Sequence, residues 1–309
     1  MWLYLAVLVG LYLLRRWHRE RQRVPDLAEK YVLITGCDSG FGNLLARQLD
    51  ARGLRVLAAC LTEPGAAQLR AAASPRLQTL VLDVTSSESI AAAAAWVAGR
   101  VGDRGTAPAP DASVRALPHP RPLLAGAGFW GCWAHPWLRC HIRPGSKNAF
   151  AAGSGSAILG RIAFYGGGYC PSKYGVEAFS DSLRRELRDF GVRVSIIEPG
   201  CFRTPIVNSE AARDSVAHAW SRCSDEVRQA YGHHYFSTCD GFLRLLSTAN
   251  SNLSLVTSAM EHALTAEHPR ARYTCGLDSQ LYYIPLSYLP SSWTDRLLHS
   301  STLKPSGSA

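Results

Sequence analysis

The stretch TGCDSGFG, Thr35 to Gly42, decides the fold class of this chain of 309 residues. It follows the run YVLI at residues 31–34, which is apolar, rich in β-formers and typical of a buried parallel strand. It precedes residues 43–49, whose apolar positions have helical periodicity. Glycines between a strand and a helix let the backbone approach a pyrophosphate, and the helix N-terminus offers free N–H groups. The stretch therefore predicts a dinucleotide site in an α/β fold with a doubly wound, Rossmann-like parallel sheet.

The spacing of the glycines is G-x-x-x-G-x-G, which differs from the commonest dinucleotide fingerprint. A second strand is expected at residues 55–60, and Glu63 follows it as a candidate partner of the ribose hydroxyls, although it lies late for that role. No arginine stands at Ser39 or just after this strand to bind a 2′-phosphate, so the sequence favours NAD over NADP. The candidate cofactor contacts in the turn are Thr35, Gly36, Ser39, Gly40, Phe41 and Gly42.

A third strand is predicted at residues 79–82, and Asp83 and Val84 follow it. A side chain at the carboxyl end of a parallel strand points into the ligand crevice, so both residues are candidate contacts with the adenine. Capping of the next helix, at residues 86–97, is the alternative role for Asp83, and the two roles are compatible with each other.

The run YCPSK places Tyr169 and Lys173 four residues apart. On a helix the two side chains share one face, and Pro171 fits because it falls in the first turn. An ammonium close to a phenol favours the phenolate and lowers its pKa from about 10. Tyr169 is therefore the predicted acid/base that exchanges the proton of an alcohol during hydride transfer, and Lys173 is predicted to lower its pKa.

The segments TGCDSGFG, YCPSK and IIEPG (residues 196–200) resemble the short-chain dehydrogenase/reductase family. Longer runs at residues 30–63, 173–187 and 260–273 resemble its microsomal retinol dehydrogenase branch, which also oxidises 3α-hydroxysteroids. The resemblance implies an NAD-dependent oxidoreductase that takes hydride from a hydrophobic secondary or allylic alcohol, a lipid-like small molecule.

The resemblance also assigns parts of the chain. It implies a dehydrogenase domain at residues 25–305 with a substrate lid at 206–250. It also implies that the protein is located at the endoplasmic reticulum membrane, and it is compatible with a homodimer. It gives Lys173 a second role in binding the nicotinamide ribose. The segment that closes over the nicotinamide in the family is matched here by Pro199, Gly200 and Thr204.

Residues 106–157 depart from the family pattern. They hold seven of the 17 prolines, and neither a strand of five residues nor an amphipathic helix is readable in them. The sheet is therefore predicted to be disrupted there. The family serine falls on Ala157, so Ser156 is the substitute candidate, although a shift of one residue turns a strand side chain to the other face. The alternative hypothesis is a catalytically inactive relative, or a decayed or mis-spliced product that acts at most as a binding protein.

The N-terminal residues 1–24 combine an apolar run, Trp2 to Leu14, with the basic sequence RRWHRER. The run is short for a membrane span, so a short anchor, an interfacial helix and a helix packed on the protein all stay open. The basic flank predicts that the main domain faces the cytosol. The net charge of +9 fits an anionic membrane surface better than a nucleic acid, because no basic run is interleaved with aromatics elsewhere.

Nine cysteines without a CxxC pair favour reduced thiols, and the Cys and His residues at 132–141 fit no zinc spacing, so no metal is expected. Near the C-terminus, residues 280–284 are predicted to form a strand. Contact with a membrane, an entry for a lipid-like substrate and ordinary core packing all remain open for this apolar tract.

Overall fold

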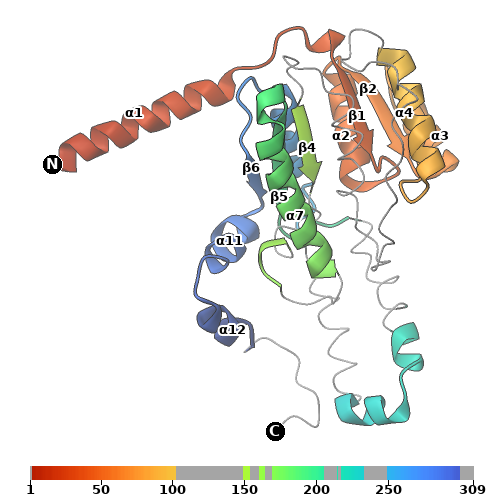
Figure 1. Cartoon of the computed structure of the whole chain (residues 1–309), viewed down its shortest axis with the longest axis vertical. Helices are drawn as coiled ribbons and strands as arrows, with labels where there is room; N and C mark the ends of the chain where they lie inside the picture. Colours follow the sequence, from red (N-terminus) through yellow and green to blue (C-terminus); the bar gives the residue numbers. More distant parts are fainter. Residues whose placement is uncertain are drawn as a thin grey trace.

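The computed structural model describes residues 2–101, 149–153, 160–163, 169–204, 214, 217–232 and 249–299. Within these residues, six strands form two parallel three-stranded sheets, ordered β1-β2-β3 and β4-β5-β6 (Figure 1). The strands are β1 (Tyr31–Thr35), β2 (Arg55–Cys60), β3 (Gln78–Val81), β4 (Ala149–Gly153), β5 (Arg193–Pro199) and β6 (Arg272–Cys275). No ladder joins the two sheets in the described part of the chain, and most of residues 106–157, where the disruption is predicted, lies outside it.

The first sheet is built from consecutive strand–helix units, as the sequence predicts. Three helices follow its strands: α2 (Gly40–Ala51), α3 (Glu63–Ala71) and α4 (Ser87–Val101). Five consecutive residues of β2, Val56 to Cys60, are buried, so this strand is covered on both faces. Its register sets Tyr31 opposite Arg55 and Leu57 opposite Gln78.

The second sheet carries the helix with the Tyr169–Lys173 pair. That helix is α7 (Tyr169–Glu186); it packs on β5 and is followed by the 3₁₀ turn η3 (Arg188–Phe190). In β5, all residues after Arg193 are buried. Strand β6 pairs with β5 in parallel, with Ile197 opposite Tyr273.

Two expectations about secondary structure are wrong. A five-residue strand, β4, does exist within residues 106–157. Its sequence AFAAG has weak β propensity, and pairing with β5 holds it in the sheet. Residues 280–284 are helical, with a π-helical turn at Ser279–Tyr283 that leads into α11 (Ile284–Leu286), and α12 (Ser291–His299) follows. The chain turns at Gly276, whose φ is +97°, and Gln280 N–H donates to the Gly276 carbonyl, so the helical turn starts directly after β6.

Helix α10 (Ser254–Thr265) connects the two halves, because it packs on α2 and also on the strands of the second sheet. Glu261 on α10 accepts a hydrogen bond from Gln48 on α2 and forms an ion pair with Arg52 at 3.2 Å. Met260 packs against the cores of both halves.

The N-terminal helix α1 (Trp2–Arg21) projects from the body of the protein (Figure 1). None of its residues is buried, so the hypothesis that its apolar run packs on the protein itself is wrong. Hydrogen bonds attach the C-terminal end of α1 and the residues after it to α10: the Glu20 carbonyl accepts from His262 Nε2 at 2.8 Å, and Val24 N–H donates to the Thr265 carbonyl at 2.8 Å. Among the described helices, none combines the length and the apolar character needed to cross a membrane.

Candidate active site

The glycine turn between β1 and α2 has the backbone that its sequence predicts. Gly36 and Gly40 have φ values of +72° and +64°, in the left-handed region that favours glycine. Gly42 lies in the first turn of α2, where an added Cβ would overlap the carbonyl oxygen of Gly36. The turn itself therefore requires three glycines, and the first N–H groups of α2, which have no partner within the helix, come directly after it.

The other predicted residues of the turn, Thr35, Ser39 and Phe41, lie at the end of β1 and the start of α2. Thr35 is the last residue of β1, and Ser39 is the N-cap of α2, although its side chain makes no capping hydrogen bond. Asn43 fixes the turn by donating from Nδ2 to the Cys37 carbonyl at 3.0 Å. Phe41 stacks edge to face on Phe202, with ring centroids 5.9 Å apart, so the turn touches the segment that follows β5.

Asp38 is the residue of this turn that the sequence prediction missed. Its carboxylate accepts hydrogen bonds from Leu61 N–H at 2.7 Å, Thr62 N–H at 3.0 Å and Thr62 Oγ1 at 2.8 Å. Partial burial acts to raise the pKa of Asp38, but these hydrogen bonds outweigh it, so its pKa is lowered. An ionised carboxylate therefore lies at the carboxyl end of β2. The sequence could have pointed to Asp38 because it is an acidic residue inside the turn, but a search for the glycine spacing alone ignores that position.

Replacing Gly42 with alanine is expected to weaken dinucleotide binding by about ten-fold or more, equivalent to about 1.4 kcal/mol. The new Cβ would overlap the Gly36 carbonyl, and the first turn of α2 would have to move away from β1. Fluorescence titration with NADH measures the effect. Gly99→Ala on α4 is the matched control, because a Cβ there meets nothing within 4 Å. Equal affinities of the two variants would contradict the prediction.

Asp83 and Val84 follow β3, as predicted. The Asp83 carboxylate accepts from Thr85 N–H at 2.8 Å and from Thr85 Oγ1 at 2.7 Å, and these bonds lower its pKa. The alternative role in capping is wrong, because Ser86 Oγ accepts the N–H of Ser89 in the first turn of α4. Val84 is half-buried beside it.

Tyr169 and Lys173 lie one turn apart at the start of α7. The Lys173 ammonium lies over the Tyr169 ring, 5.1 Å from its centroid, and the Ser172 hydroxyl donates to the Tyr169 carbonyl at 2.7 Å. The expected lowering of the pKa of Tyr169 is not found. Burial raises its pKa, because the phenolate is disfavoured away from water, and burial lowers the pKa of Lys173. The pair has the predicted placement, but burial moves both pKa values toward the neutral forms of the two side chains.

Pro199 is the last residue of β5 and Gly200 follows it; both are buried, and Thr204 is half-buried shortly after them. Gly200 N–H donates to the Cys275 carbonyl at 2.8 Å. The Asp278 carboxylate accepts the N–H of Cys201 at 2.7 Å and leaves no room for a Cβ at Gly200. With the Phe41–Phe202 contact, this places the segment after β5 against the glycine turn.

An ionic cluster built around two buried glutamates, Glu177 and Glu198, joins α7 to the second sheet. Arg272 on β6 binds Glu198 on β5 at 2.5 Å, Asp181 on α7 at 2.8 Å, and Glu177 on α7. Arg161 binds the same carboxylate oxygen of Glu198, Oε1, at 3.0 Å. Burial is the main reason that the pKa of Glu177 is raised, although Arg272 opposes the shift. Glu177 follows Lys173 by one helical turn, so the cluster fixes α7 to the sheet.

Ser156 and Ala157 lie outside the described residues, as does most of the predicted lid at 206–250. Among the described residues, no group of three or more His, Cys, Asp or Glu side chains forms a metal site.

The chain is similar to a known family and to solved structures. A model described as "short chain dehydrogenase" matches residues 30–103 and 156–215. Human retinol dehydrogenase 16 is 50% identical over 307 residues, covering 97% of each chain. Human 17-beta-hydroxysteroid dehydrogenase type 6 and mouse retinol dehydrogenase 7 are each 48% identical over 326 residues, covering 99% of each chain.

Two solved structures share the fold at low sequence identity. A short chain dehydrogenase/reductase from Burkholderia phymatum in complex with NAD gives a TM-score of 0.57 at 18% identity, covering 91% of this chain and 97% of that one. A short-chain dehydrogenase from Streptomyces avermitilis gives 0.55 at 20% identity, covering 88% and 99%.

Proposed function

The chain belongs to the short-chain dehydrogenase family, and from this membership we propose that it oxidises a hydrophobic secondary or allylic alcohol with NAD. The observation that carries the proposal is the Tyr169–Lys173 pair on the first turn of α7, in a chain whose glycine turn is held against the segment after β5. Retinol and hydroxysteroids are the proposed substrates, because relatives of about 48% identity bear the names of retinol and 17-beta-hydroxysteroid dehydrogenases.

The proposed chemistry divides between cofactor and protein. A bound nicotinamide supplies the acceptor for the hydride that leaves the carbinol carbon. Tyr169 takes the hydroxyl proton as the carbonyl forms. The Lys173 ammonium over its ring is proposed to offset the burial that raises the pKa of Tyr169, and to bind the nicotinamide ribose. The alcohol loses a hydride and a proton, so the products are the carbonyl compound, the reduced cofactor and one proton.

Several residues fit a dinucleotide. The turn of Thr35, Gly36, Ser39, Gly40, Phe41 and Gly42 is proposed to hold the pyrophosphate, because its glycines keep the backbone bare at the N-terminus of α2. Asp83 and Val84 are proposed to contact the adenine, and Pro199, Gly200 and Thr204 the nicotinamide. Ser156 is proposed to orient the substrate hydroxyl.

The preference for NAD over NADP is supported by two carboxylates at the carboxyl end of β2. Asp38 holds the N–H groups of Leu61 and Thr62 there, and Glu63 begins α3. The ribose of a dinucleotide lies at this end of the second strand in doubly wound folds. A 2′-phosphate would meet negative charge, whereas the 2′-hydroxyl of NAD can donate a hydrogen bond.

Replacing Asp38 with asparagine is expected to shift the ratio of NADPH to NADH affinity toward NADPH by about ten-fold, because one repelling charge is removed at short range. Asparagine Oδ1 still accepts one of the two backbone N–H groups, so the loop is retained. Titrations with both cofactors measure the ratio. Asp189→Asn, an exposed site on η3, removes the same charge elsewhere. A ratio that shifts equally in both variants would refute the role of Asp38.

Membrane association is part of the proposal. The exposed apolar side chains of α1, with its basic C-terminal end, favour contact with the endoplasmic reticulum membrane on its cytosolic side. A lipid-like alcohol partitions into the same membrane, so enzyme and substrate would share it.

The experiment that tests the function is a titration of the full chain with NADH, read by energy transfer from its tryptophans, followed by a turnover assay with retinol and a 3α-hydroxysteroid. Saturable binding together with turnover is the expected result. The alternative, a catalytically inactive binding relative, is favoured by one observation: the family model leaves residues 104–155 unmatched. NADH binding without turnover would establish that alternative, and folded protein that binds no NADH would show that the motifs are remnants and that this chain is not an enzyme.

A further inference from the structure

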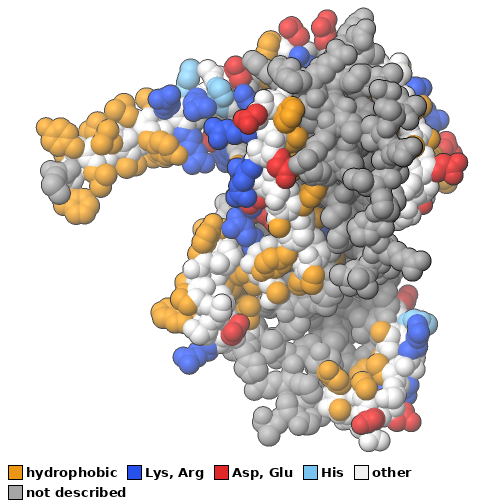
Figure 2. Space-filling view, in the orientation of Figure 1, with side chains coloured by type: hydrophobic (Ala, Val, Ile, Leu, Met, Phe, Trp, Pro, Cys, Tyr) orange, Lys and Arg blue, Asp and Glu red, His pale blue; other side chains and the backbone are white. Residues whose placement is uncertain are grey.

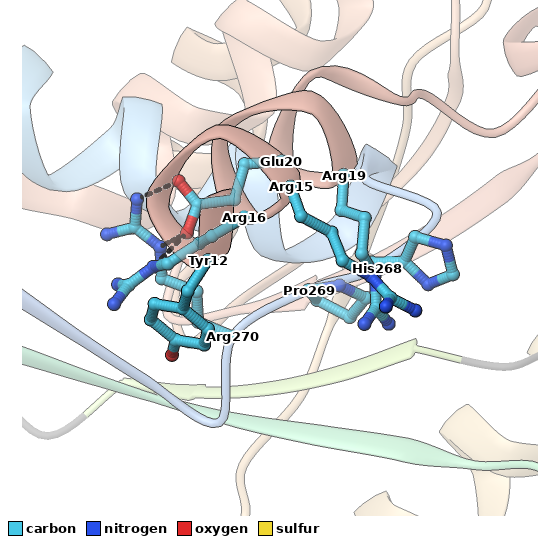
Figure 3. A pocket seen from close by; sticks show the side chains of 8 residues that line it. All are labelled: Tyr12, Arg15, Arg16, Arg19, Glu20, His268, Pro269 and Arg270. Atoms are coloured by element: carbon cyan, nitrogen blue, oxygen red, sulfur yellow. Dashed lines mark hydrogen bonds and ion pairs between the residues drawn. The ribbon is translucent and has the colours of Figure 1, made fainter. Parts of the chain in front are cut away.

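A basic pocket lies where the last turns of α1 meet the loop between α10 and β6 (Figure 3). Its volume is about 390 Å³. Its lining comes from two sequence-distant segments: Tyr12, Arg15, Arg16, Arg19 and Glu20 on α1, and His268, Pro269 and Arg270 on the loop. Neither segment makes the pocket alone, and none of these residues belongs to the proposed active site.

The charges of the pocket divide into two groups. On one side, Glu20 binds Arg270 at 2.8 Å and Arg16 at 2.9 Å. The hydrogen bond from Arg270 is the main reason that the pKa of Glu20 is lowered, to about 2, so this carboxylate is ionised at neutral pH. On the other side, Arg15 and Arg19 extend toward His268 (Figure 3) and form no ion pair with any described residue. Four arginines against one glutamate leave the pocket strongly positive.

The position of the pocket indicates the source of an anion. It lies at the base of α1, whose apolar side chains are exposed along the projecting helix, with basic side chains between them and the body (Figure 2). Thirteen apolar residues of helix measure about 20 Å, against roughly 30 Å for the hydrocarbon core of a bilayer. With these residues in the hydrocarbon, the arginines lie at the level of the lipid headgroups.

We propose that this pocket binds the phosphate of an anionic phospholipid headgroup, such as that of phosphatidylinositol. Guanidinium groups bind phosphate oxygens with paired, charge-assisted hydrogen bonds, and Arg15 and Arg19 present two of them one helical turn apart. The bound headgroup fixes the angle between α1 and the body, because Arg270 and His268 belong to the body and the other arginines to the helix. The choice of a lipid as the source rests on the membrane contact proposed above for α1.

Vesicle flotation of the purified full chain tests the proposal. The chain is expected to float with vesicles of phosphatidylcholine plus phosphatidylinositol far more than with phosphatidylcholine alone. The variant Arg15→Gln/Arg19→Gln is expected to lose about thirty-fold in partitioning to the anionic vesicles, since each arginine near an anionic surface contributes about five-fold. Both side chains are exposed and without ion pairs to described residues, so the melting temperature should not change.

The matched control removes two charges elsewhere, with Arg47→Gln/Arg185→Gln on α2 and α7. It should lose less than about three-fold, because the net charge falls equally but the pocket stays intact. Equal losses in the two double variants would overturn the pocket as a site. Equal flotation with neutral and anionic vesicles would also overturn it while leaving membrane association in place. No flotation with either vesicle would refute both the membrane contact and the site.

Inorganic phosphate and soluble glycerophosphoinositol distinguish the two sources of a phosphate group. Each is added in excess to the anionic vesicles. Flotation that persists identifies the lipid in its bilayer as the ligand. If inorganic phosphate releases the protein from the anionic vesicles, the pocket binds a free anion and the lipid assignment fails.

Discussion

Replacing Tyr169 with phenylalanine is expected to lower kcat for alcohol oxidation by about 10²–10⁴-fold while the affinity for NADH stays unchanged. The hydroxyl is the group proposed to take the proton, and phenylalanine keeps the ring under the Lys173 ammonium. Ground-state binding of the cofactor uses the glycine turn and the segment after β5, which the substitution does not touch. Steady-state kinetics with retinol and NADH titration separate the two effects.

Tyr174→Phe is the matched control for this variant. Tyr174 lies on the same helix, is 42% exposed, and is not part of the proposed machinery. Comparable losses of kcat in both variants would point to a structural effect on α7. A Tyr169→Phe enzyme with full turnover would remove Tyr169 from the mechanism.

Replacing Arg272 with methionine is expected to lower the free energy of unfolding by about 3–5 kcal/mol. Methionine fills similar space, but Glu198, whose side chain is 1% exposed, and Glu177, at 8%, would lose a shared counter-charge. Arg161 still binds Glu198, so the largest uncompensated charge falls on Glu177. The cluster connects β5, β6 and α7, so its loss should loosen the helix that carries Tyr169. Chemical denaturation measures the change.

The same variant should show a distinctive dependence on pH. The folded pKa of Glu177 is already raised above its usual value of about 4.5, because burial outweighs Arg272. Loss of Arg272 raises it further. A carboxyl whose folded pKa is raised binds a proton more readily in the folded state, so stability increases as pH falls through that pKa. The deficit of Arg272→Met should therefore be smaller near pH 5 than near pH 7.5.

Arg193→Met provides the comparison for the Arg272 variant. Arg193 begins β5, is exposed, and forms no ion pair with a described residue, so its replacement should change stability by less than about 0.5 kcal/mol. A deficit in Arg272→Met that is small, or that grows toward acid pH, would contradict the assigned role of the cluster.

The sequence was sufficient where local rules decide the structure. Strand β1, the glycine turn and α2 form one continuous unit, so the positive φ values at Gly36 and Gly40 could be expected from position alone. The start of α7 at Tyr169 followed in the same way, because Pro171 fits only the first turn of a helix.

The sequence was insufficient where distant residues decide. Arg272 binds Glu198, which lies 74 residues earlier in the chain, and Glu177, which lies 95 residues earlier. No periodicity in the sequence marks these residues as partners. Asp38 joins a loop 23 residues away. Strand β4 has only small residues around Phe150, so its own sequence gives little sign of a strand. Pairing with β5 determines its conformation. The apolar, aromatic composition of residues 280–284 predicted a strand. The chain instead turns at Gly276, and the hydrogen bond from Gln280 N–H to the Gly276 carbonyl starts a helical turn.

The packing of α10 on both cores has a consequence for how the chain folds during synthesis. Strands β1 to β3 are complete once residue 81 has left the ribosome, yet Met260 and Leu264, which pack against their core, follow roughly 180 residues later. At about 5–20 residues per second, the first sheet waits on the order of 10–40 s with part of its apolar face uncovered. During this interval we expect the nascent N-terminal half to expose apolar surface that chaperones can bind, and α1 emerges early enough to reach a membrane before the domain closes.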